Sequence, residues 1–471
     1  MKRHESWTLT RLLAVVSLSA LPLMAQVQTT PPQPSPMKPT QWPKLDERKL
    51  DNGMTVVLVP LPNVPKITVK LLFLAGSGAD LKMHPGIAQF TARVLTEGTA
   101  SRTSKQLRDD LRSIGGEITA TVDSDATTVS GSALSELAPR LFELLGDVVR
   151  HPSFPAAEVE LSRNNFLSEI EESRSQPEFV ASEQISKAVF GHDPYGFTLP
   201  QPANVSALKR EDLKHYAATW YAPNNATLIV VGDLDATTTL AAVTKAFGSW
   251  AKVELPKIPP SAPAKREKRQ ITFVDRPGSL QSVIVIGAIA PPRKDADYIP
   301  LRTANMVFGG AFYSRLTRNI REQKGYTYSP FSSADTRRRA GIFYTQASVR
   351  NEVTGPTILE MLYELDRMRV LPVTDEELQS AKTFSNGTLA LEMETQSGFA
   401  NRIASIYTYG LSRDFLPTFG TKLNALTPAD IQRVAARYFD TYHGAIVIVG
   451  DYGKVKEQVA PFGDVTLAPA K

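Results

Sequence analysis

The sequence contains no cysteine, and this absence excludes several kinds of chemistry. Disulfide bonds, thiolate metal ligands and a cysteine nucleophile all require a thiol. Histidine is also scarce, because the chain has only six, and no two of them lie close enough in sequence to form a local pair of metal ligands. They are His4, His84, His151, His192, His215 and His443.

Other catalytic and binding signatures are missing as well. The sequence has no phosphate-binding glycine loop and no serine nucleophile elbow, and its Gly-Gly pairs are typical of turns. The net charge of +5 is small for 471 residues, and acidic residues are interleaved with basic ones. This pattern does not indicate a nucleic-acid partner. The short basic runs 265–269 and 337–339 are interpreted as solvated loops.

Long hydrophobic runs are confined to the N-terminus. A basic start is followed by the apolar run Leu12–Leu23 and by the small residue Ala25, which is typical of a secretory signal peptide over residues 1–25. The run is shorter than the ~20 residues of a membrane-spanning helix. We therefore expect a periplasmic or secreted protein without a membrane span, an uncleaved signal anchor being the alternative. Residues 26–44 are rich in Pro, Gln and Thr and predict an extended tether.

The most informative feature that the sequence does contain is an internal repeat. The segment 207–233, which ends in LIVVGD, recurs at a constant offset as segment 425–451, which ends in IVIVGD. Identical or similar residues match along both segments, so the repeat indicates two duplicated halves. The Pro- and Lys-rich stretch 254–269 separates them and has the composition of a linker.

The chain is long enough for roughly two to four domains, and the repeat favours two. Alternating and fully apolar strand patterns occur with amphipathic helices in both halves. The predicted fold is α+β, with two homologous halves at 45–253 and 270–465. Each half is expected to contain a mixed, mostly antiparallel sheet with helices packed on one face.

One predicted amphipathic helix lies within the stretch from His84 to Thr99. Gln89, Ala92 and Arg93 are placed on it at positions i, i+3 and i+4, a spacing that brings side chains together on one ligand. Two histidines and a glutamate with this arrangement could bind and use zinc, whereas an amide, a methyl and a guanidinium cannot.

Two stretches, GIAQFTARVLTEGTASRTSKQL at 86–107 and GGEITATVDSDATTVSGSAL at 115–134, resemble the pitrilysin/insulinase family of zinc peptidases, in particular its mitochondrial processing peptidase-like branch. The resemblance covers nearly all of the chain after the tether and implies a clamshell of two halves. It places the family's zinc motif, H-x-x-E-H, on Gln89, Ala92 and Arg93, so that all three motif residues are replaced. The family's third zinc ligand falls on Glu169, which is retained.

If Glu169 keeps the family's position, it faces Arg93. The guanidinium could then occupy the space of the metal as a partly buried ion pair, with an Arg93 nitrogen within ~4 Å of a Glu169 oxygen. The alternative is that Glu169 is simply one charged position in the run that also contains Glu171 and Glu172.

A second signal lies in segment 308–333, for which a helix over 314–322 and a strand over 326–333 are predicted. It resembles the family segment whose arginine and tyrosine reach the substrate, and these residues correspond to Arg321 and Tyr328 here. A guanidinium and a phenol can both donate hydrogen bonds to a carbonyl or an oxyanion. The alternative is a surface arginine and a half-buried strand aromatic. The family also binds peptide along a sheet edge, and Glu117–Val122 would be that edge.

The resemblance includes heteromeric members in which one chain carries zinc and the other supplies only the arginine and tyrosine. We therefore expect a non-catalytic, zinc-less subunit of a heterodimeric metallopeptidase, with no metal or cofactor of its own. The zinc would reside in a partner subunit of the same family, and the peptide substrate would contact Arg321 and Tyr328. The chain alone is not expected to hydrolyse peptides. A structural or peptide-binding protein without catalytic contribution is the alternative.

Overall fold

The computed structural model describes residues 42–80, 84–258, 260, 263 and 265–468. The predicted signal peptide and all but the last residues of the predicted tether lie outside this range. Residues 42–44 form no helix or strand. The elements of the first half are β1 (Asp46–Lys49), β2 (Thr55–Pro60), β3 (Lys66–Phe73), η1 (Ser77–Ala79), α2 (Ile87–Val94), α3 (Ser104–Ser113), β4 (Glu117–Val122), β5 (Thr127–Leu134), η2 (Ser135–Leu137), α4 (Ala138–Arg150), α5 (Ala156–Ser175), α6 (Pro177–Phe190), η3 (Pro194–Gly196), α7 (Pro202–Ala207), α8 (Arg210–Trp220), η4 (Pro223–Asn225), β6 (Ala226–Gly232) and α9 (Ala236–Phe247).

The second half follows a similar order of elements. They are β7 (Gln270–Asp275), β8 (Gln281–Ala290), α10 (Tyr298–Asn305), η5 (Met306–Gly310), η6 (Thr317–Gln323), β9 (Phe331–Thr336), β10 (Gly341–Arg350), η7 (Asn351–Val353), α11 (Thr354–Val370), α12 (Asp375–Met393), α13 (Gln396–Tyr409), α14 (Phe415–Asn424), α15 (Pro428–Tyr438), β11 (Ala445–Gly450), α16 (Tyr452–Val459), η8 (Ala460–Phe462) and β12 (Val465–Leu467). The two copies of the sequence repeat coincide with α8 and β6 in one half and with α15 and β11 in the other.

Each half contains a six-stranded mixed sheet. The strand order is β1-β2-β6-β3-β5-β4 in the first sheet and β12-β7-β11-β8-β10-β9 in the second. In the first sheet only β2 and β6 pair in parallel, whereas in the second β7 pairs in parallel with both β11 and β12. The α+β fold with two related sheets is therefore confirmed. Strand β4 lies at an edge of the first sheet, as predicted for Glu117–Val122.

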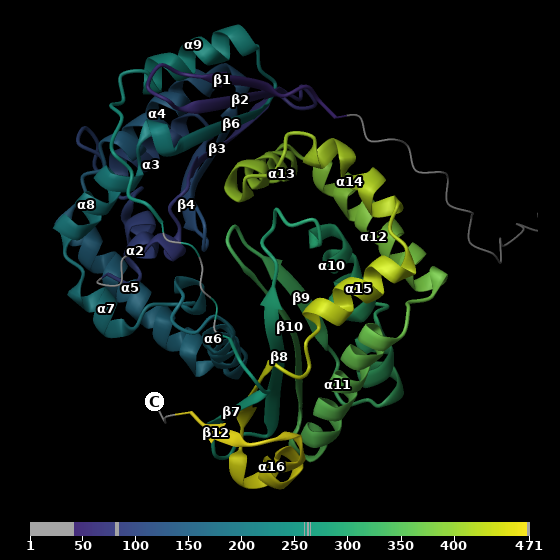
Figure 1. The fold of residues 1–471 in the computed structure, drawn as a ribbon. Helices are drawn as coiled ribbons and strands as arrows, with labels where there is room; N and C mark the ends of the chain where they lie inside the picture. Colours follow the sequence, from purple (N-terminus) through teal and green to yellow (C-terminus); the bar gives the residue numbers. More distant parts are fainter. Residues whose placement is uncertain (1–41, 81–83, 259, 261–262, 264, 469–471) are drawn as a thin grey trace, which may run out of the picture. The chain divides into compact units, whose positions relative to one another are not determined.

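The two sheets exchange a helix. Helix α6 of the first half packs on β8 and β11 of the second half, and α13 of the second half packs on β3 and β6 of the first (Figure 1). Val57 and Ile229 point toward α13, whereas their strand neighbours Val56 and Leu228 face the main core of the first half. Both faces of the central strands are thus buried, which explains why these strands are apolar almost throughout.

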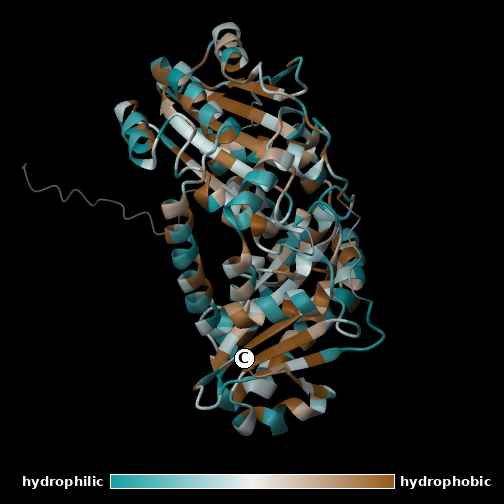
Figure 2. Cartoon of the chain, turned by 90° about the vertical axis from the view of Figure 1, so that its left-hand side faces the viewer, coloured by the Kyte–Doolittle hydropathy of each residue, from teal (hydrophilic) through white to brown (hydrophobic). Residues whose placement is uncertain are grey.

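The contacts of the exchanged helices are close. At Gly287 of β8, an added Cβ would lie 2.8 Å from the Ile185 side chain of α6, so glycine allows the approach. At the start of α13, the Gln396 amide donates a hydrogen bond of 2.9 Å to the Lys66 carbonyl of β3. The predicted helices on one face are present, and the opposite face of each sheet carries the exchanged helix. Figure 2 shows the strands of both sheets as largely hydrophobic.

The basic run 337–339 was expected to be solvated, and this prediction is wrong. These arginines form the turn between β9 and β10 and contact the first half. Arg338 donates its backbone N–H to the Asp125 carboxylate at 2.8 Å, and Arg339 donates to the Gly78 carbonyl at 3.1 Å. The Arg337 guanidinium donates to the Tyr195 carbonyl at 3.1 Å. Composition cannot reveal such contacts, because their partners are distant in sequence.

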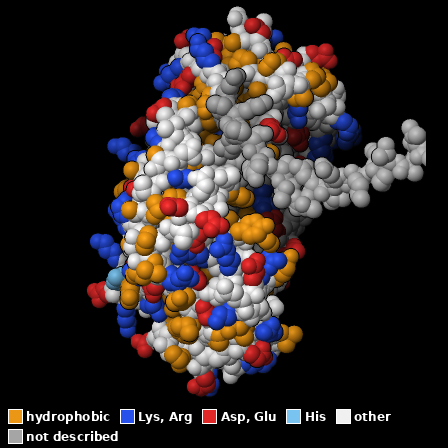
Figure 3. Space-filling model, turned by 90° about the vertical axis from the view of Figure 1, so that its right-hand side faces the viewer, with side chains coloured by type: hydrophobic (Ala, Val, Ile, Leu, Met, Phe, Trp, Pro, Cys, Tyr) orange, Lys and Arg blue, Asp and Glu red, His pale blue; other side chains and the backbone are white. Residues whose placement is uncertain are grey.

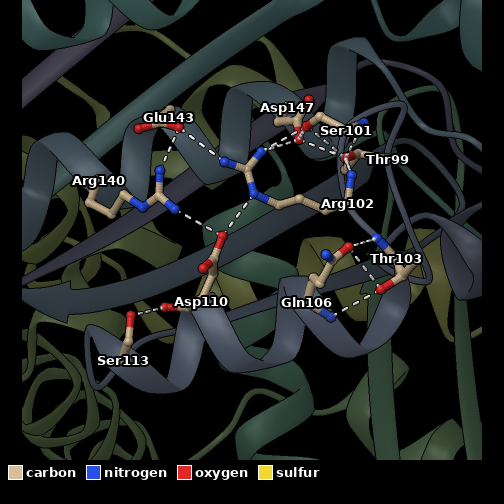
Figure 4. Close-up of polar contacts among 10 residues, drawn as sticks. All are labelled: Thr99, Ser101, Arg102, Thr103, Gln106, Asp110, Ser113, Arg140, Glu143 and Asp147. Atoms are coloured by element: carbon tan, nitrogen blue, oxygen red, sulfur yellow. Dashed lines mark hydrogen bonds and ion pairs between the residues drawn. The ribbon is translucent and has the colours of Figure 1, made fainter.

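The connection that follows α2 is fixed by a polar network between α3 and α4 (Figure 4). Arg102 contacts Asp110 at 2.8 Å and also pairs with Glu143 and Asp147. Thr99 and Ser101 donate hydroxyl hydrogen bonds to Asp147. Burial opposes the charge of Asp147, but these donors and Arg102 hold its pKa below the ordinary value. The network therefore anchors the end of the α2 segment to the rest of the half.

Hydrophobic and charged side chains are intermixed on the surface. Figure 3 shows one side of the molecule, on which hydrophobic side chains lie among lysine, arginine, aspartate and glutamate. Among the described residues, no helix is long and apolar enough to cross a membrane.

We predict that the α13 contact contributes substantially to stability. Ile403 is completely buried between α13 and the first sheet, so Ile403→Ala leaves a cavity and should lower the free energy of unfolding by about 2 to 4 kcal/mol. The matched control is Asn401→Ala, an exposed position on the same helix, with an expected change within about 0.5 kcal/mol. Urea unfolding followed by circular dichroism measures both. Equal effects would contradict the importance of the exchange.

Candidate functional site

Helix α2 begins after a left-handed glycine. Gly86 has φ 90°, a conformation that glycine adopts without steric cost, and the helix runs from Ile87 to Val94. The Asp80 carboxylate accepts hydrogen bonds from the backbone N–H groups of Gly86 at 2.6 Å and Ala88 at 3.2 Å. Asp80 thus satisfies two N–H groups that the first helical turn leaves free. The helix is shorter than the predicted stretch from His84 to Thr99 but contains all three motif positions.

The three positions on α2 have different surroundings. Ala92 is buried with only 4% of its surface exposed, and its methyl group offers no ligand atom. The Gln89 amide donates a hydrogen bond of 3.3 Å to the Thr198 carbonyl in the connection after η3. Arg93 points toward α5. Gln89 and Arg93 are four residues apart on the helix, so their side chains lie on the same face. This face is directed toward α5 and the connection after η3.

Arg93 pairs with Glu169 on α5, which agrees with the interpretation that Glu169 keeps the family's position and faces Arg93. Arg93 Nη2 lies 2.7 Å from Glu169 Oε1, and the guanidinium lies 4.1 Å from the centre of the Phe166 ring. The pair is less buried than expected, because the two side chains are 35% and 49% exposed. Such a pair contributes about 0.2 to 1 kcal/mol, since water competes for both charges.

Arg321 and Tyr328 form a second cluster in the other half. Arg321 lies on the π-helical segment η6, and its guanidinium is 4.2 Å from the centre of the Tyr328 ring and 4.8 Å from that of Phe312. Tyr328 is 75% exposed. Within the part of the chain that the structure describes, neither the Arg321 guanidinium nor the Tyr328 hydroxyl has a hydrogen-bonding partner. The cluster therefore presents donors that a ligand can use.

Two features of this segment differ from the prediction. The predicted helix over 314–322 is π-helical from Thr317 onward, and a hydrophobic pattern over so few turns does not distinguish α from π geometry. The strand predicted to begin at residue 326 begins at Phe331. Tyr328 consequently lies in the connection before the strand, where its ring is free of strand packing. It is not the half-buried strand aromatic of the alternative interpretation.

Comparisons with known proteins agree with this architecture. Residues 55–203 match the family model described as insulinase (peptidase family M16), and residues 207–384 match the model described as peptidase M16 inactive domain. The chain belongs to the insulinase family, peptidase family M16. This confirms the family that the sequence resembles.

Relatives and solved structures extend along most of the chain. A protein named uncharacterized zinc protease from Mycobacterium bovis is 26% identical over 90% of this chain and 97% of its own length. Another protein with this name, from Rickettsia felis, is 25% identical over 76% of this chain and 86% of its own length. The fold is similar to that of a peptidase M16 inactive domain from Pseudomonas fluorescens, with a TM-score of 0.80 at 24% identity, covering 86% of this chain and 98% of that one. It is also similar to a protease from Helicobacter pylori, with a TM-score of 0.81 at 20% identity, covering 87% and 100%.

The residues at the motif positions of this M16 chain do not fit zinc. Zinc in proteins is bound by imidazole, thiolate or carboxylate groups, and the positions on α2 carry an amide, a methyl and a guanidinium. The Arg93 cation repels a metal ion and already occupies the Glu169 carboxylate. Among the described residues, no group of three or more His, Cys, Asp or Glu side chains could hold a metal.

Two features beside these residues were not found from the sequence: Asp80 next to α2, and an aromatic pair next to Arg321. Asp80 lies outside any recognisable motif, and only the fold brings it to the start of α2. The aromatic pair Phe312-Tyr313 follows the Gly309-Gly310 pair after one residue, Ala311, a sequence signal that could have indicated an exposed aromatic turn. The Arg93–Glu169 pair and the Arg321 cluster come from different halves, and among the described residues no hydrogen bond or ion pair joins them.

We predict weak coupling between Arg93 and Glu169. A double-mutant cycle with Arg93→Met, Glu169→Gln and the double variant should give a coupling energy of about 0.2 to 1 kcal/mol. The coupling should decrease when the salt concentration rises, because both side chains are partly exposed. Urea unfolding of the four proteins at two salt concentrations measures it. A coupling energy of zero at low salt would show that the ion pair adds nothing to the stability of the folded protein.

Asp80 should make stability depend on pH. Burial raises the pKa of its carboxyl to about 7, against the opposing effect of the two backbone hydrogen bonds. The folded protein therefore retains a proton that the unfolded chain loses near pH 4, so the free energy of unfolding should decrease as the pH rises toward 7.

The test compares the wild type with Asp80→Asn, whose amide oxygen can still accept a backbone hydrogen bond. Between pH 5 and pH 8 the wild type should lose roughly 2 kcal/mol more than the variant. Urea unfolding at the two pH values measures this difference. If the stability of the two proteins changed equally with pH, the raised pKa of Asp80 would be contradicted.

Proposed function

We propose that this chain is the zinc-less subunit of an M16-type metallopeptidase, and that it supplies Arg321 and Tyr328 to the active site of a zinc-bearing partner subunit. The partner would be a member of the same family and would form a heterodimer with this chain. The substrate would be a peptide. The N-terminal sequence supports a periplasmic or secreted location for this complex.

The unpartnered donors of Arg321 and Tyr328 are the observation that carries the proposal. An exposed tyrosine that stacks on an arginine, with no hydrogen-bonding partner for either among the described residues, is a preorganised pair of donors. Arginine and tyrosine groups of this kind are able to hold a peptide carbonyl and to stabilise the oxyanion that forms when the carbonyl is attacked.

The first half supports the same division of roles. Proteins to which this chain is similar are named zinc proteases, yet the motif positions of this chain lack the side chains that bind zinc. The partner would carry the zinc and the attacking water. The part of this chain would be to bind the peptide, orient its carbonyl with Arg321 and Tyr328, and stabilise negative charge there.

We predict that Arg321→Ala lowers kcat of the assembled complex by about 10²- to 10³-fold, because one charge-stabilising donor is lost. Tyr328→Phe, which removes only the hydroxyl, should lower kcat about tenfold or more. The complex is recovered through an affinity tag on the full chain in its native host, and hydrolysis of a fluorogenic peptide library is measured. Lys324→Ala and Tyr442→Phe are matched controls at other exposed positions and should leave kcat unchanged.

A structural or peptide-binding protein is the second candidate. Unchanged kcat for both Arg321→Ala and Tyr328→Phe in an active complex would favour it. Metal analysis of the purified chain provides an independent check, because stoichiometric zinc with peptidase activity of the chain alone would overturn the proposal.

A further inference from the structure

An aromatic groove lies beside the Arg321 cluster. It is formed between the turn that follows η5 and one face of α12, and we define it by Met306, Phe312, Tyr313, Ser380, Ala381 and Phe384. Its volume is about 420 Å³, within the range of sites that accept a large side chain or a small ligand. The charged residues of its lining are Arg318, Glu376 and Glu377; Arg318 and Glu376 have opposite charges, and Glu377 is paired with Arg315. The groove therefore favours an uncharged, apolar occupant.

The aromatic side chains of the groove are exposed beyond what the fold requires. Phe312, Tyr313 and Phe384 are 57%, 76% and 51% exposed. In the first half, the corresponding connection between α2 and α3 contains Thr99 and Ser101, whose hydroxyl groups bind Asp147 in the α3–α4 network. The same architecture thus forms without aromatic residues at this connection. Neighbouring exposed aromatic residues are typical of a binding surface.

One wall of the groove is held in place by a bidentate ion pair. Arg315 donates from Nε and Nη2 to the two oxygens of Glu377, at 2.7 Å and 2.8 Å. Both side chains are largely buried, and the pair joins the segment just before η6 to the first turn of α12. Because this contact fixes the two walls relative to each other, the groove exists before any ligand arrives.

The groove is continuous with the Arg321 cluster through Phe312. The Phe312 ring forms part of the groove and also lies 4.8 Å from the Arg321 guanidinium, which in turn stacks on Tyr328. A peptide whose carbonyl is held by Arg321 and Tyr328 therefore passes directly beside the groove. In an extended peptide, the side chain next to this carbonyl projects away from the backbone and can enter the groove.

We propose that the aromatic groove binds a bulky apolar side chain of an extended peptide whose backbone carbonyl is held by Arg321 and Tyr328. The inference rests on the proposed function, because it assumes that the cluster binds peptide. It adds a substrate preference, which is for peptides that carry a Phe, Leu or similar side chain next to the bound carbonyl. A charged side chain gains nothing from the aromatic walls and loses its hydration.

The test uses the full chain and two short fluorescent peptides made of Gly, Ser and Thr, one with a central Phe and one with Gly at that position. Fluorescence anisotropy should show that the wild type binds the Phe peptide about tenfold or more tightly. Phe384→Ser should remove most of this preference, because it takes away a groove wall that does not contact Arg321. Leu391→Ser, an exposed position further along α12, is the matched control and should retain the preference.

The outcomes separate this inference from the proposed function. Tyr328→Phe, which removes only the hydroxyl that binds the carbonyl and leaves the Arg321–Phe312 contact in place, should weaken both peptides equally and leave their affinity ratio unchanged. Three results would overturn the proposed role of the groove. They are equal binding of the two peptides by the wild type, no binding of the Phe peptide, and a preference that survives in folded Phe384→Ser. A preference that disappears only in Phe384→Ser, together with unchanged kcat for Arg321→Ala in the complex, would uphold the groove and reject the catalytic role.

Discussion

The burial of both faces of both sheets is the constraint on which the rest of the structure depends. A sheet whose strands are apolar on both sides is stable in water only if both sides are covered. Each half supplies its own helices for one face and takes a single helix, α6 or α13, from the other half for the opposite face. Two contacts of the first half accompany this arrangement: the connection after η3 accepts a hydrogen bond from Gln89, and Arg337 in the turn between β9 and β10 donates to the Tyr195 carbonyl.

Much of the fold could be predicted from the sequence. The repeat around LIVVGD and IVIVGD predicted two related halves, and the apolar strands and amphipathic helices predicted the elements of both sheets. The exchange of α6 and α13 could not be predicted, because an apolar helix face shows that a partner exists without showing which one. The role of residues 337–339 was misjudged for a similar reason: charge patterns indicate solvent exposure unless distant partners, here Asp125 and Tyr195, are known.

The candidate site, like the fold, could be predicted only in part. The loss of zinc-binding side chains at Gln89, Ala92 and Arg93 could be read directly from residue types, and the Arg93–Glu169 contact followed from the family position of Glu169. The pair was expected to be partly buried and is more exposed than that, because exposure depends on neighbouring segments. Tyr328 was expected on a strand, but the connection before β9 is longer than predicted. In this position Tyr328 is exposed, and its ring lies against the Arg321 guanidinium.

The exchanged helices also affect how the chain is made. A ribosome completes the six strands of the first sheet once β6 has emerged, but the helix that covers the second face of this sheet is encoded by residues 396–409. Until then, Val57, Val59 and Ile229 have no native cover, and α6 lacks its own sheet. The first half can therefore build its main core from its own residues, but the second face of its sheet stays uncovered until residues 396–409 have been made. Each half thus reaches its full set of native contacts only when the other half is present.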